Sequence, residues 1–322
     1  MLNRLCWGFV VIFILTACSS KNDQIQKTTE QELKASNIAL KHLGKSLENN
    51  TIQNALKLKS YAKILKTQRP ELNALIGEVA KDATTSGPLY LGLQQRLLYA
   101  ENKDAFPDWR ERLMELKNIR QALSPRLYND ALSDSVNVLA DLSEGKLARV
   151  AAIDKNTELK TNHAKDYGAG SQYIGNPQYG HWQSNSGGTS FWAWYGMYSA
   201  FSHLTRPTYY NDWSHNRGYS YYSDYGRSRY TSPQQRTTQQ SVQNRTKKSF
   251  SRQGKNFSSP YAKRKTGSSA LSLASKTPGS RSSYASSKSS YSSGRKSTYS
   301  GSSYSSSRSG FSRTSRSYSG GK

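Results

Sequence analysis

The most informative reactive group in the sequence is the thiol of Cys18. It directly follows Leu15-Thr16-Ala17, at the end of a short apolar run from Leu5 to Leu15 that Arg4 precedes. A basic start, an apolar middle of about 7–15 residues and small residues at the end are typical of a secretory signal peptide. The run is much shorter than the roughly 20 apolar residues that a membrane-spanning helix needs. The sequence therefore predicts export, with a cysteine placed at the cleavage point.

Leu15-Thr16-Ala17-Cys18 resembles the lipobox of bacterial lipoproteins, a resemblance confined to the start of the chain. It implies that residues 1–17 are a signal peptide cleaved between Ala17 and Cys18. It also implies that the Cys18 thiol carries a diacylglyceryl group and that the new amino terminus is acylated, for example with palmitate. Ser19 stands where Asp would favour inner-membrane retention, which implies sorting to the outer membrane, facing the periplasm. The layout of the whole chain is also loosely similar to uncharacterised proteobacterial lipoproteins with Ser/Gly/Arg-rich tails. Cys6 leaves with the signal peptide, so no thiol remains for a disulfide.

The histidines do not have the spacing of a metal site. His42 and His163 stand alone, and His181, His203 and His215 form no pair at a recurrent ligand spacing. A zinc site needs three or four donors that converge on the ion. We therefore expect no metal and no other cofactor.

Three short motifs resemble those of penicillin-binding proteins and β-lactamases, in the same order. They are Ser60-Tyr61-Ala62-Lys63, Ser214-His215-Asn216 and Lys265-Thr266-Gly267. Those enzymes need the first motif at the start of a buried helix and the third on a neighbouring strand. Here Ser60 falls in the middle of an expected helix and Lys265 in an expected disordered stretch. The prediction is a protein without enzymatic activity.

Residues 28–166, which follow a short lipidated linker at 18–27, have the apolar periodicity of helices. Thr29 and Glu32 have the spacing of a capping box. Pro70 ends one helix and begins another, Thr84–Pro88 is a break, and Ser124-Pro125 reads as a cap before a last long helix that ends near Gly145. The predicted fold is mostly α, a small helical bundle or stacked helical hairpins whose leucines form the core.

Residues 167–227 are rich in aromatic side chains and in Gly, Asn and Ser, with 18 aromatics between Tyr167 and Tyr230. We expect a helix over 191–204. Three alternatives remain open for this segment: it covers a groove of the bundle, lies in a lipid headgroup layer, or presents aromatic rings to carbohydrate. The residues predicted to contact a membrane or a partner are Phe191, Trp192, Trp194, Tyr195, Tyr198 and Phe201.

Charge is distributed very unevenly along the chain. Residues 1–166 carry 24 Lys/Arg against 19 Asp/Glu, whereas residues 167–322 carry 22 Lys/Arg against two acids, Asp212 and Asp224. From residue 228 onward Ser, Gly, Lys, Arg and Tyr dominate, which predicts a disordered basic tail over 228–322 because little apolar surface is available to bury. Rings recur every five to eight residues near its end. The predicted tail contacts are Tyr284, Arg295, Tyr299, Arg308, Arg313 and Arg316.

These features together predict a non-enzymatic lipoprotein of the cell envelope. A helical protein-interaction module would be tethered to a membrane by Cys18, and the tail would bind anionic envelope polymers or lipid headgroups. Nucleic acid also suits a basic, aromatic tail, but export makes it an unexpected partner. The alternative is an accessory or assembly factor that docks on a membrane-protein complex through residues 191–204.

Overall fold

Most of the described chain is helical, which confirms the predicted mainly α fold. The computed structural model describes residues 2–150 and 152–261, with side chains placed from Asn22 onward. The tail contacts predicted beyond residue 261 lie outside the described residues. The first part comprises α1 (Leu2–Glu48), α2 (Gln53–Gln68), η1 (Pro70–Leu72), α3 (Asn73–Ala80), η2 (Lys81–Ala83), α4 (Pro88–Glu101), η3 (Lys103–Ala105), α5 (Trp109–Ala122), α6 (Pro125–Ala131), α7 (Ser133–Leu142) and α8 (Lys155–Asn162), where η marks a short helix of the 3-10 type.

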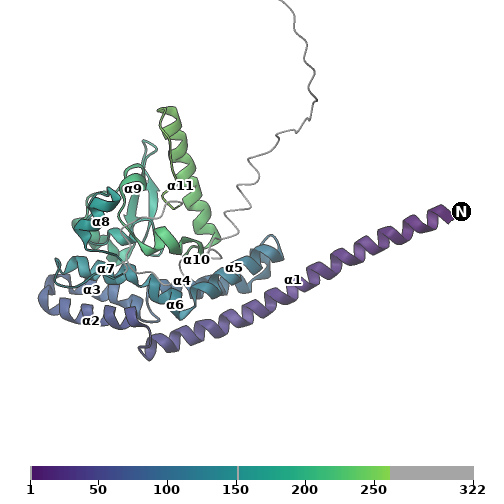
Figure 1. The fold of residues 1–322 in the computed structure, drawn as a ribbon, viewed down its shortest axis with the longest axis horizontal. Helices are drawn as coiled ribbons and strands as arrows, with labels where there is room; N and C mark the ends of the chain where they lie inside the picture. Colours follow the sequence, from purple (N-terminus) through teal and green to yellow (C-terminus); the bar gives the residue numbers. More distant parts are fainter. Residues whose placement is uncertain (1, 151, 262–322) are drawn as a thin grey trace, which may run out of the picture. The chain divides into compact units, whose positions relative to one another are not determined.

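The second part is built from short elements and one long helix. A two-stranded antiparallel hairpin lies at its centre, and a π-helical turn, η6, precedes the last two helices. The elements are η4 (Ser171–Tyr173), β1 (Gly180–Ser184), β2 (Ser190–Trp194), η5 (Gly196–His203), α9 (Tyr210–Asn216), η6 (Tyr222–Gly226), α10 (Arg227–Tyr230) and α11 (Pro233–Arg252). In Figure 1, α11 is the upright green helix above the helices of the bundle.

Prolines and caps set the ends of the bundle helices where the sequence predicts them. α2 ends at Gln68, before Pro70. α4 and α6 both begin with a proline in the first turn, Pro88 and Pro125. The expected last long helix is divided at Leu132 into α6 and α7. Within the bundle α1 packs along α5 and α4, while α2 packs against α3, α6 and α7 (Figure 1).

The predicted helix start at Thr29 is wrong. α1 runs without a break from Leu2 through the expected linker to Glu48. Thr29 is buried, and its hydroxyl donates to the carbonyl of Ile25 in the preceding turn, so it cannot cap a new helix. Glu32 forms an ion pair with Arg120 of α5 in place of a capping contact. No proline or glycine between residues 19 and 43 interrupts the helix.

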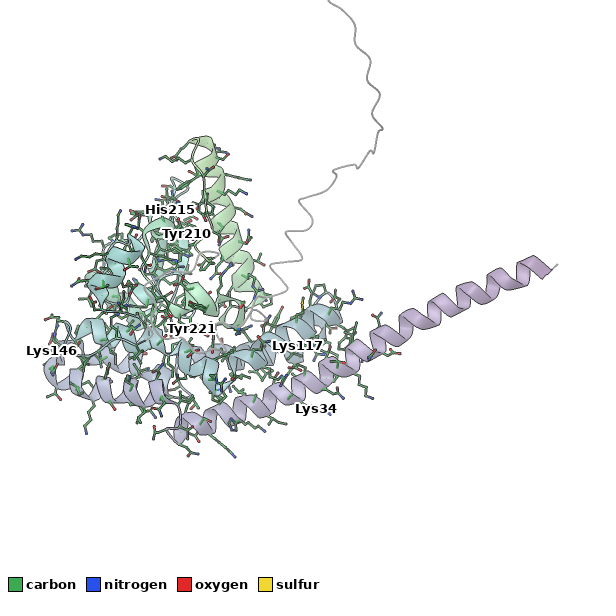
Figure 2. The ribbon with its side chains drawn as sticks, viewed as in Figure 1. Lys34, Lys117, Lys146, Tyr210, His215 and Tyr221 are labelled. Carbon is green, nitrogen blue, oxygen red and sulfur yellow. The ribbon has the colours of Figure 1, made fainter. Side chains whose placement is uncertain are left out.

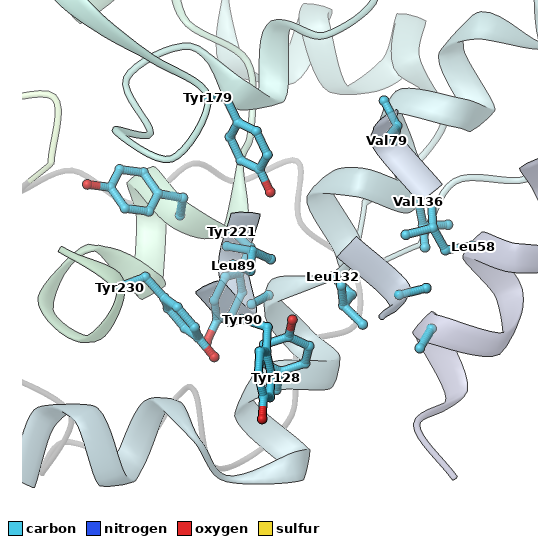
Figure 3. Packing of buried hydrophobic residues seen from close by; sticks show 14 of the residues in the cluster. Leu58, Val79, Leu89, Tyr90, Tyr128, Leu132, Val136, Tyr179, Tyr221 and Tyr230 are labelled. Carbon is cyan, nitrogen blue, oxygen red and sulfur yellow. The ribbon is translucent and has the colours of Figure 1, made fainter. Parts of the chain in front are cut away.

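The apolar positions of the bundle form its core, as expected from their periodicity. Leu58, Val79, Leu132 and Val136 are completely buried and lie together in Figure 3. Tyrosines from the aromatic segment belong to the same cluster of buried residues. They include Tyr173, Tyr179, Tyr198, Tyr219, Tyr221, Tyr222 and Tyr230. The aromatic segment therefore packs on the bundle, which is the first of the three alternatives.

A buried carboxylate, Asp82 of η2, lies where the bundle meets the aromatic segment. Its Oδ2 accepts from Ser135 Oγ at 2.7 Å, from Tyr179 OH at 2.7 Å and from Tyr173 OH at 3.4 Å. The side chain is fully buried, and no Lys or Arg forms an ion pair with it among the described residues. Burial raises the pKa of Asp82 to about 6, although these hydrogen bonds act in the opposite direction.

A second buried carboxylate, Asp134 of α7, holds the start of η6. Its two oxygens accept from the backbone N–H groups of Tyr221 at 2.7 Å and Tyr222 at 3.0 Å. Burial raises the pKa of Asp134 to about 7. No local sequence pattern marks Asp82 or Asp134, because the hydroxyl partners of Asp82 and the backbone partners of Asp134 lie about 50 to 100 positions away along the chain.

The predicted disorder from residue 228 is wrong for residues 228–261. α11 spans Pro233–Arg252, and Gln239, Val242, Gln243 and Thr246 on one of its faces are buried. Gln239 donates to Tyr222 OH at 2.8 Å and accepts from Arg227 Nε at 2.7 Å. A helix that is polar by composition thus packs through one apolar residue, Val242, and through the hydrogen bonds of Gln239. The sequence signal for it was Ser232-Pro233, which has the same form as Ser124-Pro125.

Replacing Ser232 with Ala should lower the free energy of unfolding by about 1 kcal/mol. Ser232 Oγ accepts from the N–H of Gln235, and Gln235 Oε1 accepts from the N–H of Ser232, which is a reciprocal capping box. Urea unfolding of the full chain measures the change. Ser251→Ala, an exposed substitution near the other end of α11, is the matched control. Equal stability of the two variants would contradict the capping role.

Candidate functional site

The aromatic segment contains a β-hairpin where the sequence analysis expected a helix over 191–204. β1 and β2 pair in antiparallel register, with Trp182 opposite Trp192 and Gln183 opposite Phe191. Asn185 and Thr189 close the tip, whose Gly188 has a positive φ of 76°. Side chains in β2 alternate between two faces, so the period is two and not 3.6. After Tyr195 the chain turns into η5.

The inner face of the hairpin is an aromatic cluster. Trp182 packs against Trp192, Tyr210 and Trp213 with ring centroids 4.8 to 5.2 Å apart. Val242 of α11 belongs to the same cluster. Tyr210 and His215, both labelled in Figure 2, belong to α9 beside this face. Edge-to-face and tilted contacts of this kind stabilise beyond the area that they bury.

Three of the six predicted contact residues are therefore in the interior. Trp192, Tyr198 and Phe201 are 6, 5 and 0% exposed. The prediction that they contact a membrane or partner is wrong for the described fold, because their rings are packed in the protein's own core. Phe191 and Trp194 are half-buried, and Tyr195 is exposed.

The outer face of the hairpin presents the remaining rings. An isolated bridge pairs Phe191 with Tyr209, which places both side chains on this face. His181 stacks on Tyr195 with centroids 5.4 Å apart. Tyr195 and Tyr209 are 44 and 48% exposed. We define the outer face as His181, Gln183, Phe191, Ala193, Tyr195 and Tyr209, none of which is a Lys, Arg, Asp or Glu.

A row of cations lies on α11. Arg245, Lys248 and Arg252 have the i, i+3, i+7 spacing that places side chains on one side of a helix, and all three are exposed. We call them the basic row. None of them forms an ion pair with an acid among the described residues. Lys247 and Lys255 nearby are also exposed and lack an ion pair within that same part of the chain.

The basic row is joined to the hairpin through Arg245. Its guanidinium donates to Ser184 Oγ at the end of β1. Ser184 is the last residue of β1 and pairs with Ser190 of β2. The hairpin tip, residues 185–189, is uncharged. Because side chains alternate along a strand, Ser184 and Ser190 belong to the inner face with Trp182 and Trp192. α11 therefore contacts the inner side of the hairpin, and the outer face points away from it.

Elsewhere arginines are used to hold the fold. Arg96 is buried with Glu115 at 2.7 Å and also donates to the carbonyl of Arg229. Arg217 makes a two-pronged contact with Asp224, at 2.5 and 3.1 Å. These pairs distinguish structural cations from the exposed ones of α11.

Two of the three short motifs that resemble those of penicillin-binding proteins and β-lactamases lie among the described residues. Ser60 Oγ is exposed and donates to Leu56 O of its own helix at 3.0 Å. Ser214 Oγ lies 2.8 Å from His215 Nδ1, and His215 stacks on Phe250. Lys265 lies outside the described residues. No group of three His, Cys, Asp or Glu among the described residues could hold a metal ion.

No protein family, curated protein or solved structure matches this chain. In the part of the chain that the structure describes, no helix has the length and apolar character to cross a membrane.

Proposed function

We propose that the chain is a non-enzymatic lipoprotein of the cell envelope, anchored through Cys18 and directed to the outer membrane, in which a helical protein-interaction module is combined with a basic surface that adheres to anionic envelope material. Adhesion would use the basic row of α11 together with the basic tail that follows it. The observation that carries this proposal is the basic row itself. Three exposed cations on one side of a helix have no acidic partner in the described residues, and the sequence contains no acid after Asp224.

The expected strength follows from surface electrostatics. Each Lys or Arg close to an anionic surface adds about 1 kcal/mol, and the gain falls off within a Debye length. Three ordered cations therefore supply a moderate affinity that the tail would increase. Because the cations are exposed, the binding should weaken steeply as salt is added.

The alternative is a role in assembling a membrane-protein complex through residues 191–204. Only Phe191, Trp194 and Tyr195 of its predicted contacts remain accessible. This alternative predicts that removal of the tail and the basic row leaves function intact.

Reversing the charge of the basic row should lower affinity for an anionic membrane by at least about tenfold at low salt. The variant is Arg245→Glu/Lys248→Glu/Arg252→Glu in the full chain, tested with vesicles of phosphatidylglycerol and of phosphatidylcholine. Any acyl chains on Cys18 insert into both vesicles, so the difference between them isolates the effect of charge. Raising salt from about 0.05 to 0.2 M should remove most of that difference.

The matched control reverses Lys34, Lys117 and Lys146, which are exposed on the bundle and labelled in Figure 2. It changes the net charge by the same amount and should alter affinity by less than about threefold. Equal losses in the two triple variants would mean that net charge acts without a site. Mass spectrometry of the amino terminus tests the anchor separately, since an intact Met1 or an unacylated Cys18 would contradict it.

A further inference from the structure

The contact between the bundle and the aromatic segment is lined by four buried carboxylates. They are Asp82 of η2, Asp134 and Asp141 of α7, and Glu158 of α8. Each accepts a hydrogen bond from a group of the aromatic segment. The donors are the hydroxyl of Tyr179 for Asp82, the N–H of Tyr221 for Asp134, the amide of Gln172 for Asp141 and the N–H of Tyr219 for Glu158, the first three at 2.7 Å. We call this contact the acidic joint.

Few cations compensate these carboxylates. Arg149 forms an ion pair with Glu158 at 2.5 Å and lies 3.5 Å from Asp141. No ion pair within the described residues involves Asp82 or Asp134. A carboxylate loses its hydration when it is buried, and burial therefore raises the pKa of all four carboxyls.

The other ionisable groups around the acidic joint do not remove this excess of acid. Asp82 faces only tyrosines, which are Tyr128, Tyr173, Tyr179 and Tyr198. The ionisable groups around the other three carboxyls are, besides Arg149, Lys155, Asp166, Asp224 and Tyr219. Lys155 is paired with Asp166 at 2.9 Å, and Asp224 is paired with Arg217 at 2.5 Å. Within the described part of the chain, Arg149 is thus the cation that the buried carboxylates share.

The aromatic segment also holds α11. The carbonyl of Gly175, two residues after Tyr173 of η4, accepts from Gln239 Nε2 of α11 and from Tyr261 OH, both at 3.3 Å. Val242 of α11 packs in the tryptophan cluster of the hairpin. A change at the acidic joint therefore affects how both the aromatic segment and α11 are held on the bundle.

We propose that the acidic joint is a pH-sensitive contact: the aromatic segment with α11 is docked on the bundle while these carboxyls are protonated, and it separates locally from the bundle as they ionise. Opening lets the carboxylates regain water, so ionisation favours the open form. The contact is therefore most stable at low pH and weakens as pH rises through the range in which the buried carboxyls titrate. Because α11 carries the basic row, pH would also determine how firmly that row is held, which goes beyond the proposed function and does not depend on it.

Native-state hydrogen exchange of the full chain tests this inference. At pH 8 we expect the amides of residues 173–179, several of which donate to backbone carbonyls, to exchange at least about tenfold faster than the amides of α2, with rates that change little in dilute urea. That behaviour distinguishes local opening from unfolding of the whole chain. At pH 4, after correction for the intrinsic pH dependence of amide exchange, the same amides should be protected at least about tenfold more strongly.

The variant Asp82→Asn should slow exchange of residues 173–179 at least about tenfold at pH 8 and change it by less than about threefold at pH 4. Asp104→Asn, which replaces an exposed acid of η3, is the matched control and should exchange like the unmodified protein at both pH values.

Equal rates and equal urea dependence for residues 173–179 and α2 at pH 8 would overturn the inference, because the contact would then open only when the whole protein unfolds. So would exchange of residues 173–179 that responds neither to pH nor to Asp82→Asn. The pH comparison uses the unmodified protein and decides the matter even where the Asn variant folds poorly.

Discussion

Replacing Asp82 with Asn is expected to raise the free energy of unfolding at pH 8 by up to about 3 kcal/mol. In the folded protein the pKa of Asp82 is raised from 3.8 to about 6 by burial. Between these values the folded state binds more protons than the unfolded state, so stability falls as pH rises through this window and is lowest above it. Asn carries no charge, and the cost of ionising a buried carboxyl therefore disappears.

The amide can also replace the hydrogen bonds of the carboxylate. Its nitrogen can donate to the hydroxyl oxygens of Ser135 and Tyr179, because hydroxyl groups both donate and accept. At pH 4, where most of the buried carboxyl is protonated, the variant and the unmodified protein should differ by less than about 1 kcal/mol. Comparing the two proteins at each pH cancels the titration of Asp134, which is common to both.

Urea unfolding of the full chain at pH 4, 6 and 8 measures this difference. Asp82→Ala is the control, since it removes the charge but leaves Ser135, Tyr173 and Tyr179 without their acceptor, and it should be destabilised at pH 4 by about 2 kcal/mol. An Asn variant that is less stable than the unmodified protein at pH 8 would mean that Asp82 is ionised without cost in the folded state.

Ending the chain after residue 227 should destabilise the aromatic segment by about 4 kcal/mol or more, whereas ending it after residue 261 should change stability by less than about 0.5 kcal/mol. The shorter chain loses Val242 from the tryptophan cluster and the hydrogen bond of Gln239 to Tyr222. It also loses the hydrogen bond from Tyr230 OH to Ala122 O, which ties α10 to α5.

Tryptophan fluorescence during urea unfolding reports this change, because the side chains of Trp182, Trp192 and Trp213 are each almost completely buried. The chain that ends after residue 261 is the control, because it loses the basic sequence from residue 262 onward but keeps α11. If both truncated chains unfold at the same urea concentration, α11 contributes nothing to the fold, and the prediction of disorder from residue 228 would be correct.

The helix ends of the bundle could be predicted because their signals are local. Pro70, Pro88 and Pro125 remove a backbone donor and fix φ, so they determine where a helix can begin or end whatever surrounds them. The leucine periodicity likewise depends only on helix geometry, and Leu58 and Leu65 are buried as it requires. Thr29 shows the limit of such reasoning, since a capping pattern inside a helix without a breaker caps nothing.

The tertiary structure alone decided what the aromatic segment and the polar helix after it do. Phe191–Trp194 can alternate as a strand or align as a helix, and pairing with β1 selects the strand. α11 is too polar to be ordered by itself. It folds because Gln239 donates to the carbonyl of Gly175, 64 positions away, and because Val242 joins the cluster of Trp182 and Trp192. The buried roles of Asp82 and Asp134 could not be predicted for the same reason, because most of their hydrogen-bond partners are distant in the sequence.

For charge, too, the sequence determined one part and the tertiary structure another. The excess of Lys and Arg and the absence of acids after Asp224 are properties of composition, so they can be read from the sequence by itself. Only the folded chain shows which cations are already satisfied, because ion pairing depends on distance in space. Arg96 and Arg217 are buried beside carboxylates, while Arg245, Lys248 and Arg252 face solvent with no acid beside them among the described residues.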